Sequence, residues 1–229
     1  MPEDIKMIKD HEHIRYNHVH YDHQEMIKRS GEFYNWMETR RSVREFSDQP
    51  IPREVIKNII KSASTAPSGA HKQPWTFCVV SNQELKKKIR EAAEKEEYES
   101  YTKRMSEEWL EDLKPMATDW HKPFLEIVPY LIIVFKRPFE YDKEGKKRQN
   151  YYVNESVGLA AGMLITAIHD AGLVTLTHTP SPMNFLQKIL NRPDNERAFL
   201  LLPIGYEADN VYVPNNRRKS LDEMAVFYE

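Results

Sequence analysis

The chain has 229 residues, the size of one large α/β domain or of two small ones. Hydrophobic residues make up 40% and charged residues 30%, which is typical of a folded globular protein and excludes a disordered chain. There are 33 Lys and Arg against 35 Asp and Glu, so the net charge of −2 offers no basic surface for nucleic acid. The single cysteine, Cys78, excludes an intrachain disulfide framework, and its apolar surroundings indicate a core residue rather than a nucleophile.

Membrane segments are not expected. The longest run in the second half without a charged or histidine side chain, residues 156–168, is too short to cross a bilayer of about 30 Å. The first ten residues mix charged and apolar side chains and lack the apolar core of a signal peptide. We therefore expect a cytoplasmic protein that binds neither membranes nor nucleic acid.

Residues 1–22 predict an extended arm that holds much of the histidine content. Imidazoles two residues apart on a strand share a face, so a metal site is one interpretation of this cluster. No cysteine and few carboxylates accompany the imidazoles, which favours a polar arm that lies on a partner, and no metal is expected. The histidines of the cluster are His11, His13, His18 and His20 in the arm and His23 directly after it.

The apolar spacing of the remaining chain predicts alternating helices and strands. Helices are expected over residues 23–39, 53–64, 152–171 (followed by Gly172 as its cap) and 183–190. Strands are expected over residues 75–81, 127–136, 173–177 and 198–206, with loops at 66–74 and 142–149. Strands separated by helices favour one layered α/β or α+β domain over residues 23–229. Its last part, about 207–229, is expected to be an extended tail.

Residues 84–112 form an unusually polar helical segment. Of these 29 positions, 17 carry a charged side chain, so little apolar surface is left for packing. A polar excursion between two core strands is typical of an active-site lid, which we place at about residues 84–122. We expect a bound ligand to order roughly residues 90–120 of this lid.

The arginine group RRSVR, residues 40–44, is a candidate phosphate site. Arg40 and Arg44 are four residues apart and would share a helix face, and Ser42 adds a hydroxyl group. Guanidinium groups that converge on one point bind phosphate in a bidentate manner, although a solvated basic patch is an open alternative. The chain has no GxGxxG or GxxxxGKS sequence, so the nucleotide loops built on glycine are not expected.

Several motifs together carry a resemblance to a known family. They are RRSVREF (40–46), TAPSGAHKQPWTF (65–77), DAGLVTLTHTP (170–180) and LLLPIGY (200–206). In combination they resemble the nitroreductase superfamily of FMN enzymes. The middle of the chain resembles, more narrowly, the iodotyrosine deiodinases within it, through EEYESYTKRM (96–105) and DWHKPFL (119–125). The resemblance covers the chain from about residue 16 to its end.

This resemblance implies a nitroreductase-like FMN-binding fold, in which helices flank a central, mainly antiparallel sheet. It also implies an intertwined homodimer, in which the arm and the tail wrap the other chain and both chains build each site. The residues expected to bind FMN are Arg40, Arg41, Ser42, Val43, Arg44, Ser68, Thr177, His178, Thr179 and Arg218. Thr179 is the catalytic candidate, because a hydroxyl that donates near flavin N5 favours one-electron steps. His178 stands where vertebrate members have threonine, and we interpret it as a packing or flavin-edge residue.

The resemblance also implies a substrate and a reaction. Glu97 would bind the ammonium group of a halotyrosine, Lys122 its carboxylate, and Tyr101 would add a hydrogen bond. The amide of Ala70 would meet the phenol oxygen and favour the phenolate. The implied reaction is reductive dehalogenation of mono- and diiodotyrosine to tyrosine and halide. The electrons would come from NAD(P)H, directly or through a reductase.

Two other functions stay open from the sequence. A general NAD(P)H-dependent nitroreductase or quinone reductase would share the fold and the cofactor. A non-catalytic sensor that binds flavin or tyrosine would share the site without turnover. The first is favoured if Glu97, Tyr101 and Lys122 do not face the flavin site, and the second if ligand binds without halide release.

Overall fold

The computed structural model describes residues 4–229, so the first three residues of the expected arm lie outside the described residues. The contacts group the chain into two units, residues 1–39 and 40–229, and each is described by itself. The expected helix at 23–39 therefore groups with the N-terminal unit rather than with the sheet domain, where the sequence placed it.

The N-terminal unit contains a hairpin and one helix. Strands β1 (Ile5–Ile8) and β2 (His11–Ile14) pair antiparallel, so the expected arm is partly a hairpin. Its two turn residues, Lys9 and Asp10, both have positive φ, as the tight turns that suit twisted strands require. The predicted helix is confirmed as α1 (His23–Glu38), and Asp22 caps it by accepting a hydrogen bond from the backbone amide of Glu25 at 2.8 Å.

Within the described part of the chain, no group of three or more His, Cys, Asp or Glu side chains could hold a metal ion. None of the helices among the described residues is both long and apolar enough to cross a membrane.

The second unit is built on a four-stranded antiparallel sheet. Its strand order is β3–β4–β8–β7, and each pair of neighbours runs antiparallel. The bounds are β3 (Trp75–Val80), β4 (Tyr130–Lys136), β7 (Val174–Thr175) and β8 (Arg197–Gly205). All four predicted strands are therefore present, although β7 is shorter than expected.

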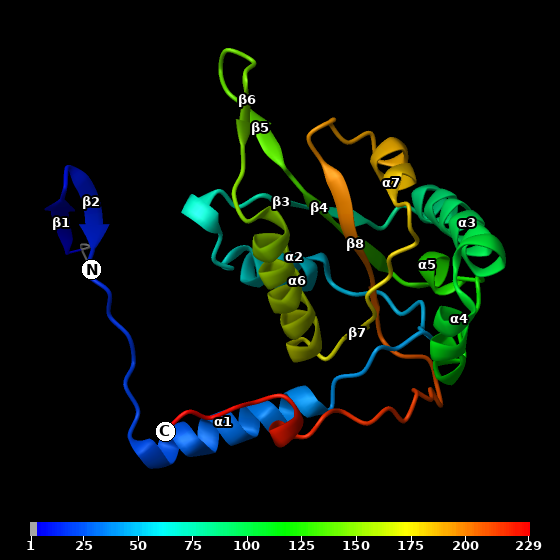
Figure 1. Cartoon of the computed structure of the whole chain (residues 1–229), viewed down its shortest axis with the longest axis horizontal. Coiled ribbons are helices and arrows are strands. Elements are labelled where there is room, and N and C mark those ends of the chain that lie inside the picture. The colour runs from blue at the N-terminus through cyan, green and yellow to red at the C-terminus, as the bar shows by residue number, and fades with distance from the viewer. Residues whose placement is uncertain (1–3) are drawn as a thin grey trace. The chain divides into compact units, whose positions relative to one another are not determined.

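Helices cover both faces of this sheet (Figure 1). Ile132 and Val134 of β4 pack with α2 (Arg53–Ser64) and α6 (Val153–Asp170) in one core. Leu131 and Ile133 point to the other face, because side chains alternate along a strand. There they pack in a second core with residues of α3 (Gln83–Glu99), α5 (Phe124–Ile127) and α7 (Asn184–Ile189). The expected layered α+β arrangement is confirmed.

The strand expected at 127–136 starts later than predicted. Ile127 ends the short helix α5, and β4 begins only at Tyr130. Pro129 explains the difference, since the residue before a proline is forced out of the helical region and Val128 is extended at φ −57° and ψ 145°.

The charged loop expected at 142–149 is also more ordered than predicted. Strands β5 (Phe139–Tyr141) and β6 (Lys147–Gln149) form a hairpin. The Asp142 carboxylate shapes the turn, because one of its oxygens accepts hydrogen bonds from the amides of Glu144 and Lys146.

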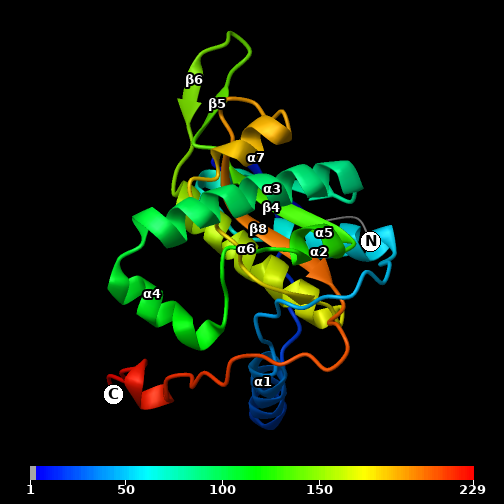
Figure 2. The same ribbon diagram turned by 90° about the vertical axis from the view of Figure 1, so that its right-hand side faces the viewer.

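The polar segment 84–112 splits into two parts that differ in packing. In α3, Ile89 and Ala93 are buried, so the expectation of weak packing is wrong for this helix. Beyond it, a π-helical turn (Ser100–Arg104) leads to α4 (Glu107–Leu113), and neither has a buried residue. Figure 2 shows the chain leaving α3, passing through α4 and returning to α5 at the side of the sheet. Only this second part keeps the character expected of a lid.

Candidate active site

Backbone pairing brings the arginine segment and the 174–179 segment together. The amide of Val43 donates to the carbonyl of Thr175 at 3.2 Å, and Ser42 forms a parallel bridge with Thr175. The backbone of His178 exchanges two hydrogen bonds, of 2.9 and 3.0 Å, with Leu201 of β8. Both segments are therefore fixed by the sheet, which is the rigid support that a binding site needs.

A first cavity, of about 270 Å³, is lined mainly by arginines. Burial and the like charges of Arg218 and Arg41 lower the pKa of Arg40. Arg218 also donates to the carbonyl of Arg40 at 2.9 Å, which ties the tail to the arginine segment. Such a concentration of guanidinium groups suits a phosphate. The lining residues are Arg40, Arg41, Ser42, Arg44, Met116, Val213, Pro214, Asn216, Arg217 and Arg218.

Arg217 is engaged differently from its neighbour in sequence. It binds the Glu223 carboxylate in a bidentate pair at 2.6 and 2.9 Å, and these bonds, with two hydrogen bonds from Ser220, lower the pKa of Glu223 to about 2. The sequence-based choice of Arg218 rather than Arg217 for a phosphate is consistent with this pairing.

A second cavity, of about 160 Å³, gathers the expected substrate residues. Glu97, Tyr101 and Lys122 line it together with Thr177, His178, Thr179 and Arg44, so seven of the predicted site residues share one cavity. Arg44 lines both this cavity and the first, which makes the two cavities neighbours. The other lining residues are Met105, Trp109, Leu113, Thr118, Phe124 and Leu176.

Glu97 and Lys122 face each other in this second cavity. The Lys122 Nζ atom lies 3.9 Å from Glu97 Oε2, and the two side chains are only 5% and 12% exposed. Burial raises the pKa of Glu97, and burial also lowers the pKa of Lys122. The Lys122 ammonium lies 5.6 Å from the centre of the Tyr101 ring. The site thus holds one anion and one cation, both poorly hydrated, beside an aromatic ring.

The 118–122 loop orients Lys122. Its ammonium donates to the Thr118 hydroxyl at 3.2 Å and to the carbonyl of Asp119. The Tyr101 hydroxyl donates to the carbonyl of Thr118 at 3.4 Å, so the lysine and the tyrosine share one support. None of these three hydrogen bonds could be predicted, because spacing in sequence does not show how a loop folds.

His178 is a buried residue in the lining of the second cavity. Its ring packs edge to face on Phe124, with the ring centres 5.8 Å apart, and its Nδ1 lies 3.9 Å from Glu97 Oε1. Burial lowers the pKa of His178 to about 3, with smaller contributions from the charges of Lys122 and Arg44. Its Nε2 has no hydrogen-bond partner among the described residues. The imidazole is therefore neutral at ordinary pH, which agrees with its interpretation as a packing residue.

Three expected site residues line neither cavity: Val43, which is buried, and Ser68 and Ala70. The Ser68 hydroxyl accepts a hydrogen bond from the amide of Gln73 at 2.9 Å, and Ala70 is exposed with a φ of 49°. A Cβ atom on Gly69 would lie 2.9 Å from the Tyr152 ring, so only glycine lets this loop lie against residue 152. The loop is held in a strained conformation, as binding loops often are.

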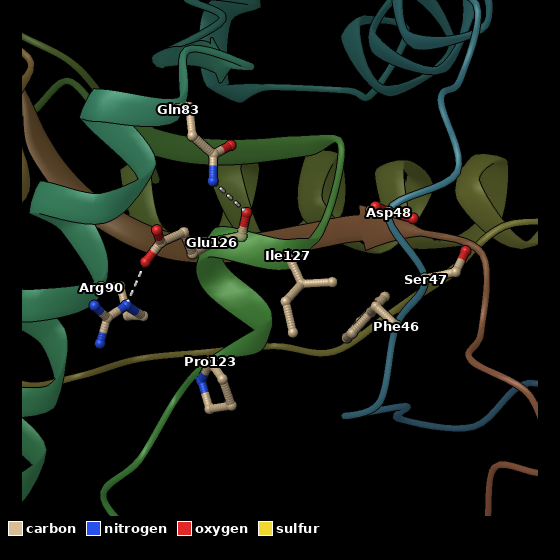
Figure 3. Close-up of a pocket in the computed structure, with 8 residues that line it drawn as sticks. All are labelled: Phe46, Ser47, Asp48, Gln83, Arg90, Pro123, Glu126 and Ile127. Atoms are coloured by element: carbon tan, nitrogen blue, oxygen red, sulfur yellow. Dashed lines mark hydrogen bonds and ion pairs between the residues drawn. The ribbon is translucent and has the colours of Figure 1, made fainter.

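A third cavity, of about 680 Å³, holds none of the predicted site residues (Figure 3). It is lined by residues of α3, of α5 with the preceding Pro123, and of the segment 46–48. Arg90 and Glu126 form an ion pair at its edge. The lining residues are Phe46, Ser47, Asp48, Gln83, Arg90, Pro123, Glu126 and Ile127.

Comparisons with known proteins agree with this geometry. Residues 37–206 match the sequence pattern of the Nitroreductase family. The iodotyrosine deiodinase of Haliscomenobacter hydrossis is 61% identical, over 94% of this chain and 97% of that protein. Iodotyrosine deiodinase 1 of Homo sapiens is 46% identical, over 94% of this chain and 75% of that protein.

Solved structures show the same fold. A crystal structure of an oxidized iodotyrosine deiodinase bound to FMN and 3-iodo-L-tyrosine superposes with a TM-score of 0.72 and 31% identity, covering 85% of this chain and all of that one. A Bacteroides fragilis nitroreductase with bound FMN matches with a TM-score of 0.65 and 18% identity, over 86% of this chain and 99% of that one. The second likeness supports the fold alone.

Proposed function

We propose, from the premise that this chain belongs to the nitroreductase family and to the iodotyrosine deiodinases within it, that it dehalogenates halotyrosines reductively with FMN as its cofactor. One observation carries the proposal. Glu97, Tyr101 and Lys122 lie in a single cavity with Thr177 and Thr179, next to the arginine cavity. An amino-acid clamp and a candidate phosphate site are thereby neighbours.

The residues present fit FMN. Burial, together with the like charges of Arg218 and Arg41, lowers the pKa of Arg40, and a phosphate dianion would offset the positive charge gathered there. Arg218, Ser42 and Arg44 would hold that phosphate, with Arg41 in the same lining. Val43 would hold the segment in place through its backbone bond to Thr175. The exposed residues Thr177 and Thr179 would contact the flavin ring, because their neighbour His178 is turned into the core.

The clamp explains how a halotyrosine would be recognised. Glu97 would accept hydrogen bonds from the substrate ammonium, Lys122 would bind its carboxylate, and Tyr101 would add a hydrogen bond. Glu97 and Lys122 now face each other at 3.9 Å. A bound zwitterion would give each of them a partner of opposite charge, so neither buried charge would be left unmatched. The apolar lid residues Trp109 and Leu113 would screen the bound substrate from water.

The phenol end would be bound by a second copy of this chain. Ser68 and Ala70 line neither cavity of their own chain, which supports an intertwined homodimer whose partner supplies this loop. In that arrangement the Ala70 amide would donate to the phenolate oxygen. The tail, about residues 207–229, and the arm, residues 1–22, would wrap the partner.

Bound reduced FMN would supply the two electrons that, with one proton, replace the carbon–halogen bond by a carbon–hydrogen bond and release tyrosine and halide. The chain's own residues bind and orient the substrate, exclude water and, through the Thr179 hydroxyl, donate a hydrogen bond near flavin N5 that favours one-electron steps. NAD(P)H, directly or through a reductase, would then reduce the oxidised FMN again. A cytoplasmic location stays a prediction.

The alternatives are less well supported. A general nitroreductase or quinone reductase has no use for a buried Glu97–Lys122 pair, which costs desolvation energy unless a zwitterion uses it. A sensor that binds flavin or tyrosine without turnover would share the clamp. Halide release distinguishes the sensor from the enzyme.

The test is anaerobic. The FMN-loaded protein is reduced with dithionite and mixed with diiodotyrosine, and iodide and tyrosine are measured. We expect both products in step with flavin oxidation. Binding without iodide release would favour the sensor, and release of iodide only from halophenols that lack the amino-acid group would contradict the clamp.

A further inference from the structure

Helix α3 presents a stripe of charged side chains to the segment that carries Lys122. The stripe residues follow one another at spacings of four, four and three, so they share one helix face. They are Lys86, Arg90, Glu94 and Glu97. Of these four, Glu97 lines the substrate cavity, whereas the other three contact the Lys122–Val128 segment by hydrogen bonds.

Glu94 uses both oxygens of its carboxylate. Its Oε1 accepts a hydrogen bond from the backbone amide of Lys122 at 2.8 Å. Its Oε2 accepts one from Arg90 Nη1 at 2.7 Å. Glu94 is 15% exposed, so water competes little for either bond. The carboxylate therefore joins the backbone of Lys122 to α3.

Arg90 and Lys86 hold the rest of the segment. Arg90 Nε donates to Glu126 Oε2 at 2.6 Å, and Figure 3 shows this bond between α3 and α5. Lys86 Nζ donates to the carbonyls of Glu126 and Val128 at 3.0 and 2.6 Å. These carbonyls lie at the C-terminal end of α5, where a helix leaves its acceptors unpaired. The segment is thus fixed to α3 beyond Lys122 as well.

We propose that Glu94 is a positioning residue for the substrate clamp, because it sets where the Lys122 side chain starts relative to Glu97. This inference rests on the proposed function. The lysine side chain is long and flexible, so its ammonium is well placed only if its backbone is fixed. Glu94 and Glu97 lie on the same helix, one turn apart. The positions of both clamp residues, Glu97 and Lys122, are therefore set by this one rigid helix.

A purely structural role for Glu94 predicts a different result from a positioning role. If the Arg90–Glu94 pair only stabilises the fold, its loss affects every substrate alike. If Glu94 positions Lys122, its loss affects substrates that carry the amino-acid group and spares those that lack it. Comparison of 3-iodotyrosine with 2-iodophenol separates the two, because the phenol offers nothing for Lys122 to bind.

The experiment uses the FMN-loaded, dithionite-reduced full chain under anaerobic conditions. The variants are Glu94→Ala, Glu94→Gln, Arg90→Gln and, as a matched control, Glu91→Ala, which removes an exposed charge from the same helix. For Glu94→Ala we expect KM for 3-iodotyrosine to rise about tenfold or more with kcat little changed. The rate with 2-iodophenol and the FMN affinity should stay at the wild-type level.

The other variants test how the rise in KM depends on each hydrogen bond of Glu94. Glu94→Gln keeps one acceptor oxygen for the Lys122 amide and should raise KM less than Glu94→Ala. Arg90→Gln removes the tether of Glu94 and should show the same selectivity for 3-iodotyrosine, which keeps the inference testable if Glu94→Ala fails to fold. Glu91→Ala should match the wild type.

The outcomes are separable from those of the proposed function. Equal losses on 3-iodotyrosine and 2-iodophenol in Glu94→Ala, or no loss on either, would overturn the positioning role while wild-type iodide release upholds the proposed function. A wild type that releases no iodide from 3-iodotyrosine would overturn both.

Discussion

The Lys122 ammonium and the Glu97 carboxylate lie 3.9 Å apart, in contact range but beyond the length of a good hydrogen bond. Each group carries a pKa displaced toward its neutral form by burial. The pair is therefore poorly satisfied by itself, and a ligand that offers both charges would satisfy it better.

Removal of Lys122 should weaken recognition of the amino-acid group. We expect Lys122→Ala to weaken 3-iodotyrosine binding about 30-fold or more, because Glu97 then lacks the compensating cation and the substrate carboxylate has no partner. Quenching of flavin fluorescence measures this affinity. FMN content should be unchanged, and unchanged affinity for 3-iodotyrosine would remove the main support for the substrate.

Removal of Arg218 should weaken FMN binding through the phosphate alone. Arg218→Ala deletes one of the guanidinium groups that line the first cavity, and we expect about a tenfold loss of FMN affinity. Riboflavin lacks the phosphate and serves as the matched ligand. Isothermal titration of the apoprotein should show an unaltered riboflavin affinity, and an equal loss for both flavins would place the phosphate elsewhere.

His178 should make the fold sensitive to acid. Its pKa falls from 6.5 to about 3 on folding, so between these pH values the unfolded chain binds a proton that the folded chain does not. Stability therefore rises with pH across this window and is lost on acidification, by at most about 1.4 kcal/mol per pH unit. Urea unfolding of wild type and His178→Asn at about pH 7 and about pH 5 measures this difference. A variant that loses as much stability as the wild type would show that the imidazole is already protonated in the fold.

Thr179 should set the balance between dehalogenation and nitroreduction. Loss of its hydroxyl in Thr179→Ala removes the proposed donor near flavin N5, so we expect slower iodide release and faster NAD(P)H-dependent reduction of a nitroarene. Single-turnover rates of both reactions give the ratio. Thr179→Ser keeps the hydroxyl and should retain the wild-type ratio, whereas a parallel change in both rates would point to a general loss of flavin binding.

Much of the fold followed from local patterns. The apolar spacing in α2 and α6 predicted their extents almost to the residue, because one face of each helix packs on the sheet. The helix α5 was missed, since its four residues adjoin an apolar strand and only Pro129 separates the two. The packing of α3 was misjudged, because the few apolar residues Ile89 and Ala93 are enough to bury one face of it.

Local sequence patterns predicted less of the site than of the fold. Glu97 and Lys122 belong to different elements, and no periodicity relates them; only the family resemblance indicated that they act together. Thr118, Trp109 and Leu113 were not singled out, because their roles depend on how the 100–122 segment turns back on the sheet. Ser68 and Ala70 stay predictions that depend on a second copy of the chain.

Arg44 borders both cavities, so its positive charge acts on the groups in each of them. Burial is the main cause that lowers the pKa of Lys122 and of His178, and the charge of Arg44 adds to it in both cases. A dianion held beside Arg44 would offset that influence and let Lys122 keep its proton to higher pH. Because protonated Lys122 binds the substrate carboxylate, a phosphate bound in the first cavity would strengthen substrate binding in the second. By thermodynamic reciprocity, bound substrate would strengthen phosphate binding to the same extent.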